Sequence, residues 1–161
     1  STARRGSGSS TRVWWIHMIL KLPRSANVNV VSANGGISIR NMSSKVVAHA
    51  RNGGISLASC GGDSKLSTEN GGIAVENVSG KVEATTDRGT ISLKLHNNET
   101  MNPTVEARTS EAGDIVCRTA CEGGSASWNA DRTYLRLGST SMVPAIRLMT
   151  TGAPIIIDQV R

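Results

Sequence analysis

The sequence is poor in aromatic residues. Phe is absent, and among 161 residues there are one tyrosine and three tryptophans. A domain of this ordinary size must therefore fill its core with Ile, Val, Leu, Ala and Thr. Small and β-branched side chains of this kind suit closely packed strands. The composition favours a β-rich fold with a narrow interior.

Cysteine is also scarce, and three residues do not make a disulfide framework. Cys60 falls in a column of inward apolar residues, so we expect a buried thiol. A disulfide between Cys117 and Cys121 is left open by the sequence. The C-x-x-x-C spacing is a weak pattern for zinc, because no pair of histidines lies near it.

Histidine is equally rare, and His17, His49 and His96 are scattered along the chain. They form no Ser/His/Asp, Cys/His or metal-ligand grouping. We therefore expect no catalytic residues, no metal site, no cofactor and no enzyme activity.

Long hydrophobic runs are absent too. The densest apolar stretch, Val13 to Leu22, holds ten residues before Pro23, which is too few to cross a bilayer. We expect no transmembrane segment. No signal peptide is visible, although a chain that begins at Ser1 could have lost one.

The charge is moderately basic, with 18 Lys and Arg against 12 Asp and Glu, a net charge of +6. Such a balance suits an anionic partner, for example an acidic polysaccharide or a membrane surface. Three arginines of the first twelve residues supply half of the excess. A basic stripe with interleaved aromatics is missing, so nucleic acid is a poor candidate.

Glycine, in contrast, recurs at a fixed spacing. Four glycines lie 18 residues apart, and each opens a similar phrase (NGGISI, NGGISL, NGGIAV, RGTISL): Gly35, Gly53, Gly71 and Gly89. Gly113 and Gly152 resume the phrase after a wider gap. A fixed short period is typical of stacked repeats. Because Asn-Gly tolerates positive φ, we expect these glycines to form sharp structural turns.

A second apolar pattern shares the period. Val28, Val30 and Ser32 align with residues 46, 48 and 50, and again with residues 64–68 and 82–86. A spacing of two places each triplet on one strand face, with mostly polar residues between its members. Asn-Gly is also a hairpin signal, but hairpins have no reason to keep an 18-residue register. The pattern predicts an all-β, single-domain parallel β-solenoid, in which residue i stacks on residue i+18.

We expect about seven coils of roughly 18 residues, in chain order. A loop insertion at 94–104 interrupts the period, and a final coil covers about residues 146–157. Residues 1–12 are rich in Gly, Ser and Arg and are expected to form a flexible basic arm. Residues 13–161 would form the solenoid domain.

The two ends of a solenoid expose unpaired strand edges, which either are capped or recruit another copy. The apolar strand at 13–22 and the apolar strand near 154–157 are expected at opposite ends. The first either caps the first coil or meets another subunit. The candidate assembly interface comprises Trp14, Trp15, Ile19, Ile155 and Ile157.

Several motifs resemble a known family. They are Leu22-Pro23, Asn34-Gly35, Val78-Ser79-Gly80-Lys81-Val82 and the closing Thr150-Thr151-Gly152-Ala153-Pro154-Ile155. The chain resembles, over about residues 13–159, the bacterial adhesin-like domain of unknown function built from β-strand repeats. The resemblance implies a β-solenoid fold and a non-enzymatic role in the bacterial cell envelope or extracellular space. It carries no catalytic residue over to this chain.

The sequence thus predicts a structural or adhesin-like module that assembles into a homo-oligomer or fibre through its ends. A monomeric glycan- or surface-binding module, which would use the 94–104 loop and one sheet face, is the alternative. A degenerate carbohydrate-active enzyme is a third reading. It would rest on acidic residues expected on one face: Glu69, Glu83 and Asp87.

Overall fold

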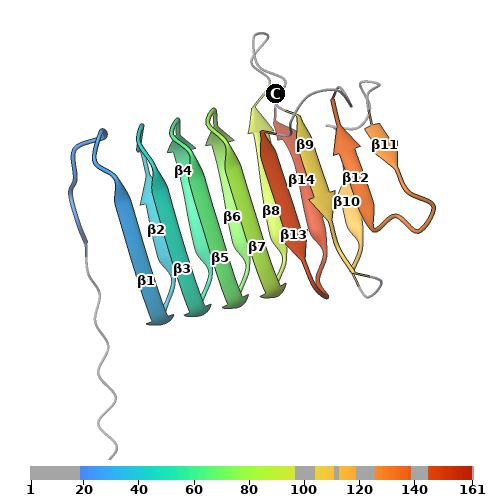
Figure 1. The fold of residues 1–161 in the computed structure, drawn as a ribbon, viewed down its shortest axis with the longest axis horizontal. Helices are drawn as coiled ribbons and strands as arrows, with labels where there is room; N and C mark the ends of the chain where they lie inside the picture. Colours follow the sequence, from blue (N-terminus) through green and yellow to red (C-terminus); the bar gives the residue numbers. More distant parts are fainter. Residues whose placement is uncertain (1–18, 97–103, 111–112, 119–125, 139–144, 161) are drawn as a thin grey trace, which may run out of the picture.

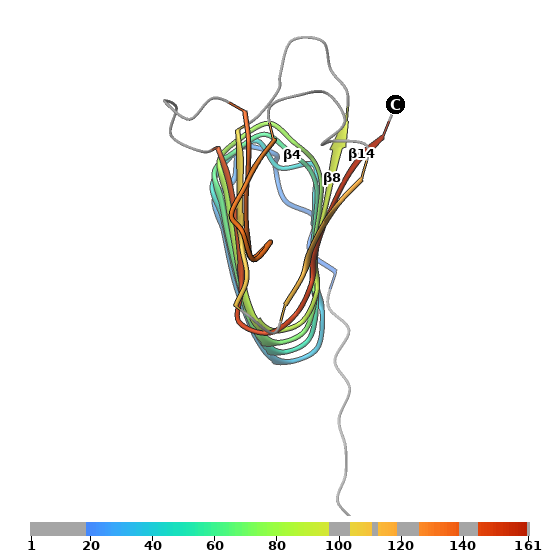
Figure 2. The same ribbon diagram turned by 90° about the vertical axis from the view of Figure 1, so that its right-hand side faces the viewer.

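A computed structural model describes residues 19–96, 104–110, 113–118, 126–138 and 145–160. These residues form strands and no helix, and the strands make two sheets that face each other (Figures 1 and 2). The predicted all-β class is confirmed.

The larger sheet, sheet A, has eight strands. Their spatial order is β1 (Val28–Asn34), β3 (Val46–Asn52), β5 (Ser64–Asn70), β7 (Val82–Arg88), β13 (Ile146–Thr150), β9 (Val105–Arg108), β12 (Tyr134–Leu137) and β11 (Ala126–Trp128). Sheet B has six strands, β2 (Ile37–Arg40), β4 (Ile55–Cys60), β6 (Ile73–Val78), β8 (Ile91–His96), β14 (Ile155–Val160) and β10 (Ile115–Cys117).

The 18-residue period is confirmed from β1 to β8. In sheet A, residue 28 pairs with 46, 46 with 64 and 64 with 82, always in parallel. In sheet B, residue 37 pairs with 55, 55 with 73 and 73 with 91, also in parallel. The chain alternates between the sheets, so each 18-residue repeat gives one strand to each of them (Figure 2).

The core lies between the sheets and is narrow, as the composition predicts. Inward residues such as Val46, Ala48, Ile73 and Val75 are buried, and their neighbours on the strands face outward. No aromatic side chain is among the buried residues of the described ranges. Cys60 is a free, buried thiol, as expected.

The turn glycines are required mainly by close stacking of backbones. A Cβ at Gly53 would collide with the carbonyl oxygen of Gly35, and Gly71 and Gly89 would each collide with the glycine before them. Gly35 alone among these four has a positive φ, 134°. The expectation of positive φ at the other three turns is therefore wrong.

Positive φ occurs instead at the opposite corner of the repeat. Three non-glycine residues adopt it there, spaced 18 residues apart: Asn41 (59°), Ser59 (55°) and Asn77 (50°). Asn is one of the few residues that visit this conformation readily. The two corners of each repeat thus use different devices, close approach at Gly and left-handed backbone at Asn or Ser.

The predicted chain order of the coils is wrong after β8. The strand pair β13 and β14 stacks directly on β7 and β8, with Ile146 paired to Val82 and Ile155 paired to Ile91. The earlier pair, β9 and β10, lies on the far side of it (Figure 1). Strands β12 and β11 then extend sheet A in antiparallel, so sheet A is mixed.

Charges on the outer face of sheet A give a physical reason for this order. One column reads Lys65, Glu83, Arg147, Glu106 and Arg136 in spatial order, so its sign alternates at every step. Lys65 lies 3.3 Å from Glu83, and Arg147 lies 3.8 Å from Glu106. Direct stacking of β9 on β7 would place Glu106 opposite Glu83, which is unfavourable for like charges.

Charges on sheet B alternate in the same way. Asp158 on β14 pairs with Lys94 on β8, and its carboxylate lies 4.0 Å from the guanidinium of Arg118 just after β10. Without β14 between them, the two cations would be neighbours. In both sheets the C-terminal strand pair therefore separates like charges.

The boundaries expected from the sequence fall largely outside the described residues. The predicted arm at 1–12 lies outside them, as does most of the predicted insertion at 94–104. All described strands belong to the two facing sheets.

Candidate functional site

The structure describes three of the five predicted assembly residues, and they lie in two different environments. Trp14 and Trp15 are outside the described residues. Ile19 is 75% exposed, and residues 19–22 are not a strand, contrary to the expectation for that part of 13–22. Ile155 and Ile157 are completely buried.

The placement of Ile155 and Ile157 on an end surface is therefore wrong. Strand β14 lies inside sheet B, between β8 and β10, and both side chains point into the core. The repeat itself explains this, because Ile155 pairs with the inward Ile91 and Ile157 with the inward Leu93.

The remaining turn glycines differ from one another. A Cβ at Gly113 would collide with the side chain of Thr109, whereas a Cβ at Gly152 would meet no atom within 4 Å. Gly113 is needed for close packing. Gly152 has room for a side chain.

The N-terminal end of the stack presents an open strand edge. Strand β1 is the terminal strand of sheet A, and within the described residues it pairs with β3 alone. Its sequence, VNVVSAN, contains no charged residue. Val31 at its centre is 72% exposed. Edges of soluble proteins usually carry charges, prolines or bulges that prevent pairing, and β1 has none of these.

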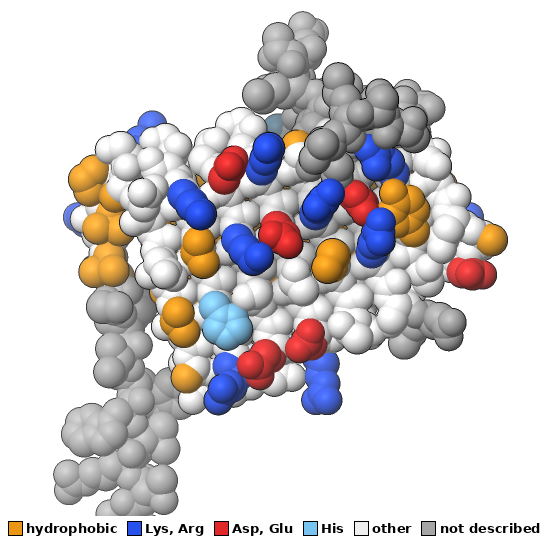
Figure 3. Space-filling view, viewed as in Figure 1, with side chains coloured by type: hydrophobic (Ala, Val, Ile, Leu, Met, Phe, Trp, Pro, Cys, Tyr) orange, Lys and Arg blue, Asp and Glu red, His pale blue; other side chains and the backbone are white. Residues whose placement is uncertain are grey.

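Other apolar side chains are exposed at the same end. Of the seven large hydrophobic residues that are exposed in the described ranges, four precede or belong to β1: Ile19, Leu20, Leu22 and Val31. In Figure 3 orange side chains follow the edge formed by β1 and the segment before it. A concentration of this kind is typical of interaction surfaces.

The segment before β1 covers a corner of the first repeat. The backbone N–H of Ser43 donates to the carbonyl of Arg24 at 2.8 Å, and the hydroxyl of Ser44 donates to the carbonyl of Ser25 at 2.8 Å. The N–H of Gly61 makes the same bond to Met42 one repeat later. Residues 24 and 25 thus continue the corner column, and among the described strands only β3 pairs with β1.

The other end of the stack is different in kind. It finishes in two strands of three residues each, β11 and β10. Trp128 on β11 is 37% exposed, and the guanidinium of Arg132 lies 5.7 Å from its ring. The guanidinium of Arg108 lies 5.1 Å from the Tyr134 ring. This end therefore has short strand edges, and it carries aromatic rings with guanidinium groups beside them.

Acidic residues on sheet A are engaged by neighbouring cations. Glu83 pairs with Lys65, and the carboxylate of Glu69 lies 3.6 Å from Arg51. The ring of His49 shares a 2.8 Å hydrogen bond with the hydroxyl of Ser67 on the outward face. No group of three His, Cys, Asp or Glu side chains suited to a metal ion occurs in the described ranges.

Cys117 forms a disulfide, and Cys121 lies outside the described residues. The sequence alone did not decide whether Cys117 is bonded. It lies at the end of sheet B, where β10 has one strand neighbour, β14.

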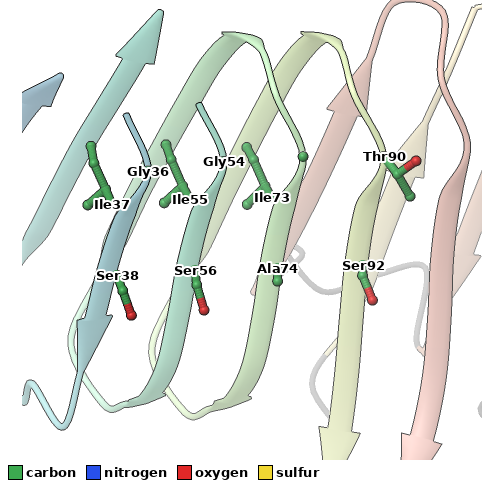
Figure 4. A pocket seen from close by; sticks show the side chains of 11 residues that line it. Gly36, Ile37, Ser38, Gly54, Ile55, Ser56, Ile73, Ala74, Thr90 and Ser92 are labelled. Carbon is green, nitrogen blue, oxygen red and sulfur yellow. The ribbon is translucent and has the colours of Figure 1, made fainter. Parts of the chain in front are cut away.

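Sheet B carries a shallow groove of about 640 Å³ on its outer face (Figure 4). It crosses the beginnings of β2, β4, β6 and β8, and small side chains form its floor. The outward residues in it come from two columns of the repeat: Gly36, Gly54, Gly72 and Thr90, then Ser38, Ser56, Ala74 and Ser92. The small columns make the groove flat and extended.

Comparisons with protein-family models, with curated proteins and with solved structures found no match to this chain. In the part of the chain that the structure describes, no helix has the length and apolar character needed to span a membrane.

Proposed function

We propose that the chain is a β-solenoid structural protein that associates with copies of itself through an open end of its stack. The solenoid is supported by the 18-residue register in both sheets and by the alternation of the chain between them. The stack is compatible with a β-helix-like path, although its C-terminal part departs from chain order.

The observation that carries self-association is the edge of β1. It is seven residues long and uncharged, and its central residue, Val31, is mostly exposed. An edge with these properties is a template for another strand. A homo-oligomer or fibre is therefore the assembly that we expect.

An adhesin-like, non-enzymatic role in the bacterial envelope or extracellular space is part of the proposal. It is supported by the motif resemblance and by the engagement of Glu69 and Glu83 in ion pairs on an open face. A carbohydrate-active enzyme needs carboxylates that flank a bound sugar, and salt bridges between adjacent strands do not provide this arrangement.

Light scattering of the purified chain, together with negative-stain electron microscopy, tests self-association. The proposal predicts particles of at least twice the mass of the 16.9 kDa chain. A monomeric mass at all concentrations up to those of the electron-microscopy sample would contradict it.

The groove on sheet B supports a second candidate, a module that binds an extended polymer such as a glycan chain. Its repeating hydroxyls, from Ser38, Ser56 and Ser92, are spaced by the strand separation or multiples of it. Binding on a glycan array that is lost in a Ser56→Arg variant would support this function. Equal binding by both proteins would exclude the groove.

A further inference from the structure

We propose that Asn34 is a site of spontaneous deamidation, at which the folded chain converts a side-chain amide to a carboxylate. Asn52 and Asn70 share its local sequence, Asn-Gly-Gly-Ile, but the fold protects them. This inference goes beyond self-association, because it concerns a covalent change within one chain.

The chemistry follows from the Asn-Gly sequence. The backbone nitrogen of Gly35, after losing its proton to a base in solution, attacks the side-chain carbon Cγ of Asn34. The N–Cγ bond forms, the Cγ–Nδ2 bond breaks, and the nitrogen leaves as ammonia. Water then opens the cyclic imide and leaves aspartate or isoaspartate. Because glycine has no side chain to obstruct the attack, the three Asn-Gly pairs should react at similar rates in the unfolded chain.

In the folded chain, one hydrogen bond restrains every attacking nitrogen. Each turn glycine donates its N–H to the backbone carbonyl one repeat later, at 3.0 to 3.1 Å: Gly35 to Asn52, Gly53 to Asn70, and Gly71 to Arg88. All three asparagines are exposed. Each can therefore react only when local opening frees the nitrogen, and the ease of that opening decides which asparagine reacts.

The asparagine side chains form a hydrogen-bonded row across sheet A. The Nδ2 group of Asn70 donates to Oδ1 of Asn52, and the Nδ2 group of Asn52 donates to Oδ1 of Asn34, each at 3.0 Å. Asn34 begins the row, because β1 is the terminal strand of the sheet. Among the described strands, β1 has a neighbour on one side, whereas β3 and β5 have neighbours on both. Opening at Asn34 therefore breaks fewer contacts.

A hydroxyl group holds the inner turns and is missing at the first one. In the inner turns a threonine donates to the glycine carbonyl 15 residues before it: Thr68 to Gly53 at 2.9 Å, and Thr86 to Gly71 at 3.0 Å. The equivalent residue for Gly35 is Ala50, which has no hydroxyl. The carbonyl of Gly35 accepts instead from Ser32 of its own repeat, at 3.1 Å. The turn at Asn34 thus lacks a bond between repeats.

The backbone around Gly35 is also less crowded. A Cβ at Gly53 or Gly71 would collide with the backbone of the preceding turn, whereas the nearest atom to a Cβ at Gly35 is the hydroxyl of Ser32, at 3.7 Å. The φ of Gly35 is 134°, so its turn also differs in conformation. The terminal position, the missing hydroxyl and the free space all favour reaction at Asn34.

Peptide mass spectrometry of the full chain, aged in mildly alkaline buffer, tests the site. Trypsin places the three asparagines in separate peptides, 25–40, 52–65 and 66–81. Opening at Asn52 or Asn70 breaks at least two more hydrogen bonds than opening at Asn34. Each bond shifts an equilibrium by a factor of about 2 to 10, so Asn34 should react about 10-fold faster.

The chain in denaturant supplies the reference, because all three asparagines should react there at similar rates. Equal rates in the folded chain would overturn the proposal, as would a faster rate at Asn52 or Asn70. A folded chain that reacts at none of the three, while the denatured chain reacts, would overturn it too.

Two variants test the cause. Ala50→Ser supplies the missing hydroxyl and should slow the reaction at Asn34 by a factor of about 2 to 10. Thr68→Ala removes a hydroxyl from the second turn and should accelerate Asn52 by a similar factor. Asn70 in the same molecule is the internal reference. A uniform change at all three asparagines would indicate altered global stability and would overturn the role of the hydroxyls.

Deamidation at Asn34 would put a charge on the β1 edge, which otherwise has none. This consequence rests on the proposed self-association, because charges on an edge oppose strand pairing. Light scattering of Asn34→Asp should show smaller particles than the unmodified chain. Asn70→Asp is the matched control, at the same turn position two strands inward, and should not change the particle mass. Unchanged mass for Asn34→Asp would overturn this consequence. A monomeric unmodified chain would overturn self-association, while the peptide rates would still decide the modification site.

Discussion

The position of the C-terminal strand pair can be tested by reversing one charge. Arg147 on β13 lies between Glu83 on β7 and Glu106 on β9. Its guanidinium is 3.8 Å from the carboxylate of Glu106, whose side chain is only 12% exposed. An Arg147→Glu variant would place three carboxylates side by side on adjacent strands.

The expected destabilisation follows from the two cross-strand pairs. Each favourable pair on a sheet contributes about 0.2 to 1 kcal/mol, and like charges cost a similar amount. Arg147 is 52% exposed, so solvent screening keeps both terms at the modest end of Coulombic values. Two pairs that change sign give about 2 kcal/mol. For a chain of this size that lowers the melting temperature by about 4–8 °C.

Thermal melting at low and high salt is the assay. At about 1 M salt the Debye length falls to about 3 Å, so most of the loss should disappear. Met149→Glu is the matched control, on the same strand and face. Its register neighbours are Thr85 and Arg108, so its melting temperature should change by less than about 2 °C. Equal losses in the two variants would refute the placement of β13 between β7 and β9.

Two further predictions concern the repeat. Gly71→Ala places a methyl group against the carbonyl of Gly53 and should destabilise the fold by about 3 kcal/mol, whereas Gly152→Ala, which meets no atom, should be nearly neutral. Matching chemical denaturation midpoints for the two would argue against stacked backbones. Ile73→Asp puts an unpaired charge in the core and should prevent folding, while Ala74→Asp on the exposed face should fold. Circular dichroism distinguishes the two, and equal folding would contradict the inward–outward assignment.

The strands and their buried faces could be predicted from the sequence because the 18-residue period results from the stacking of successive repeats. Residues such as Ile37 and Ile55 recur at 18 because they occupy stacked positions, and the alternation of apolar residues reports burial. The same rule assigns Ile155 to the core. Treating it as an interface residue overlooked the repeat in favour of its place near the end of the chain.

The order of the strand pairs could not be read from the period. The phrases that begin at residues 82, 105 and 146 have similar inward residues, so any of them can stack on another. The signal that distinguishes them is the charge on the outer face. Alternation of sign through Glu83, Arg147 and Glu106 favours the observed order over the chain order.

The role of the glycines could also be predicted only in part from the sequence. A sequence shows that Gly53 and Gly71 tolerate positive φ, but it does not show how near the next backbone lies. The structure shows that the neighbouring backbone leaves no room for a Cβ at these positions. The open edge of β1 was similarly hidden, because its exposure depends on where residues 19–27 run.

Amide hydrogen exchange of β1, resolved by residue at two protein concentrations, tests the central claim most directly. The amides of Val30 and Ser32 face β3 and should be protected at both concentrations. Those of Asn29 and Val31 should be protected at the higher concentration and should exchange freely on dilution. Free exchange of the Val31 amide in a particle of dimer mass would contradict pairing through β1.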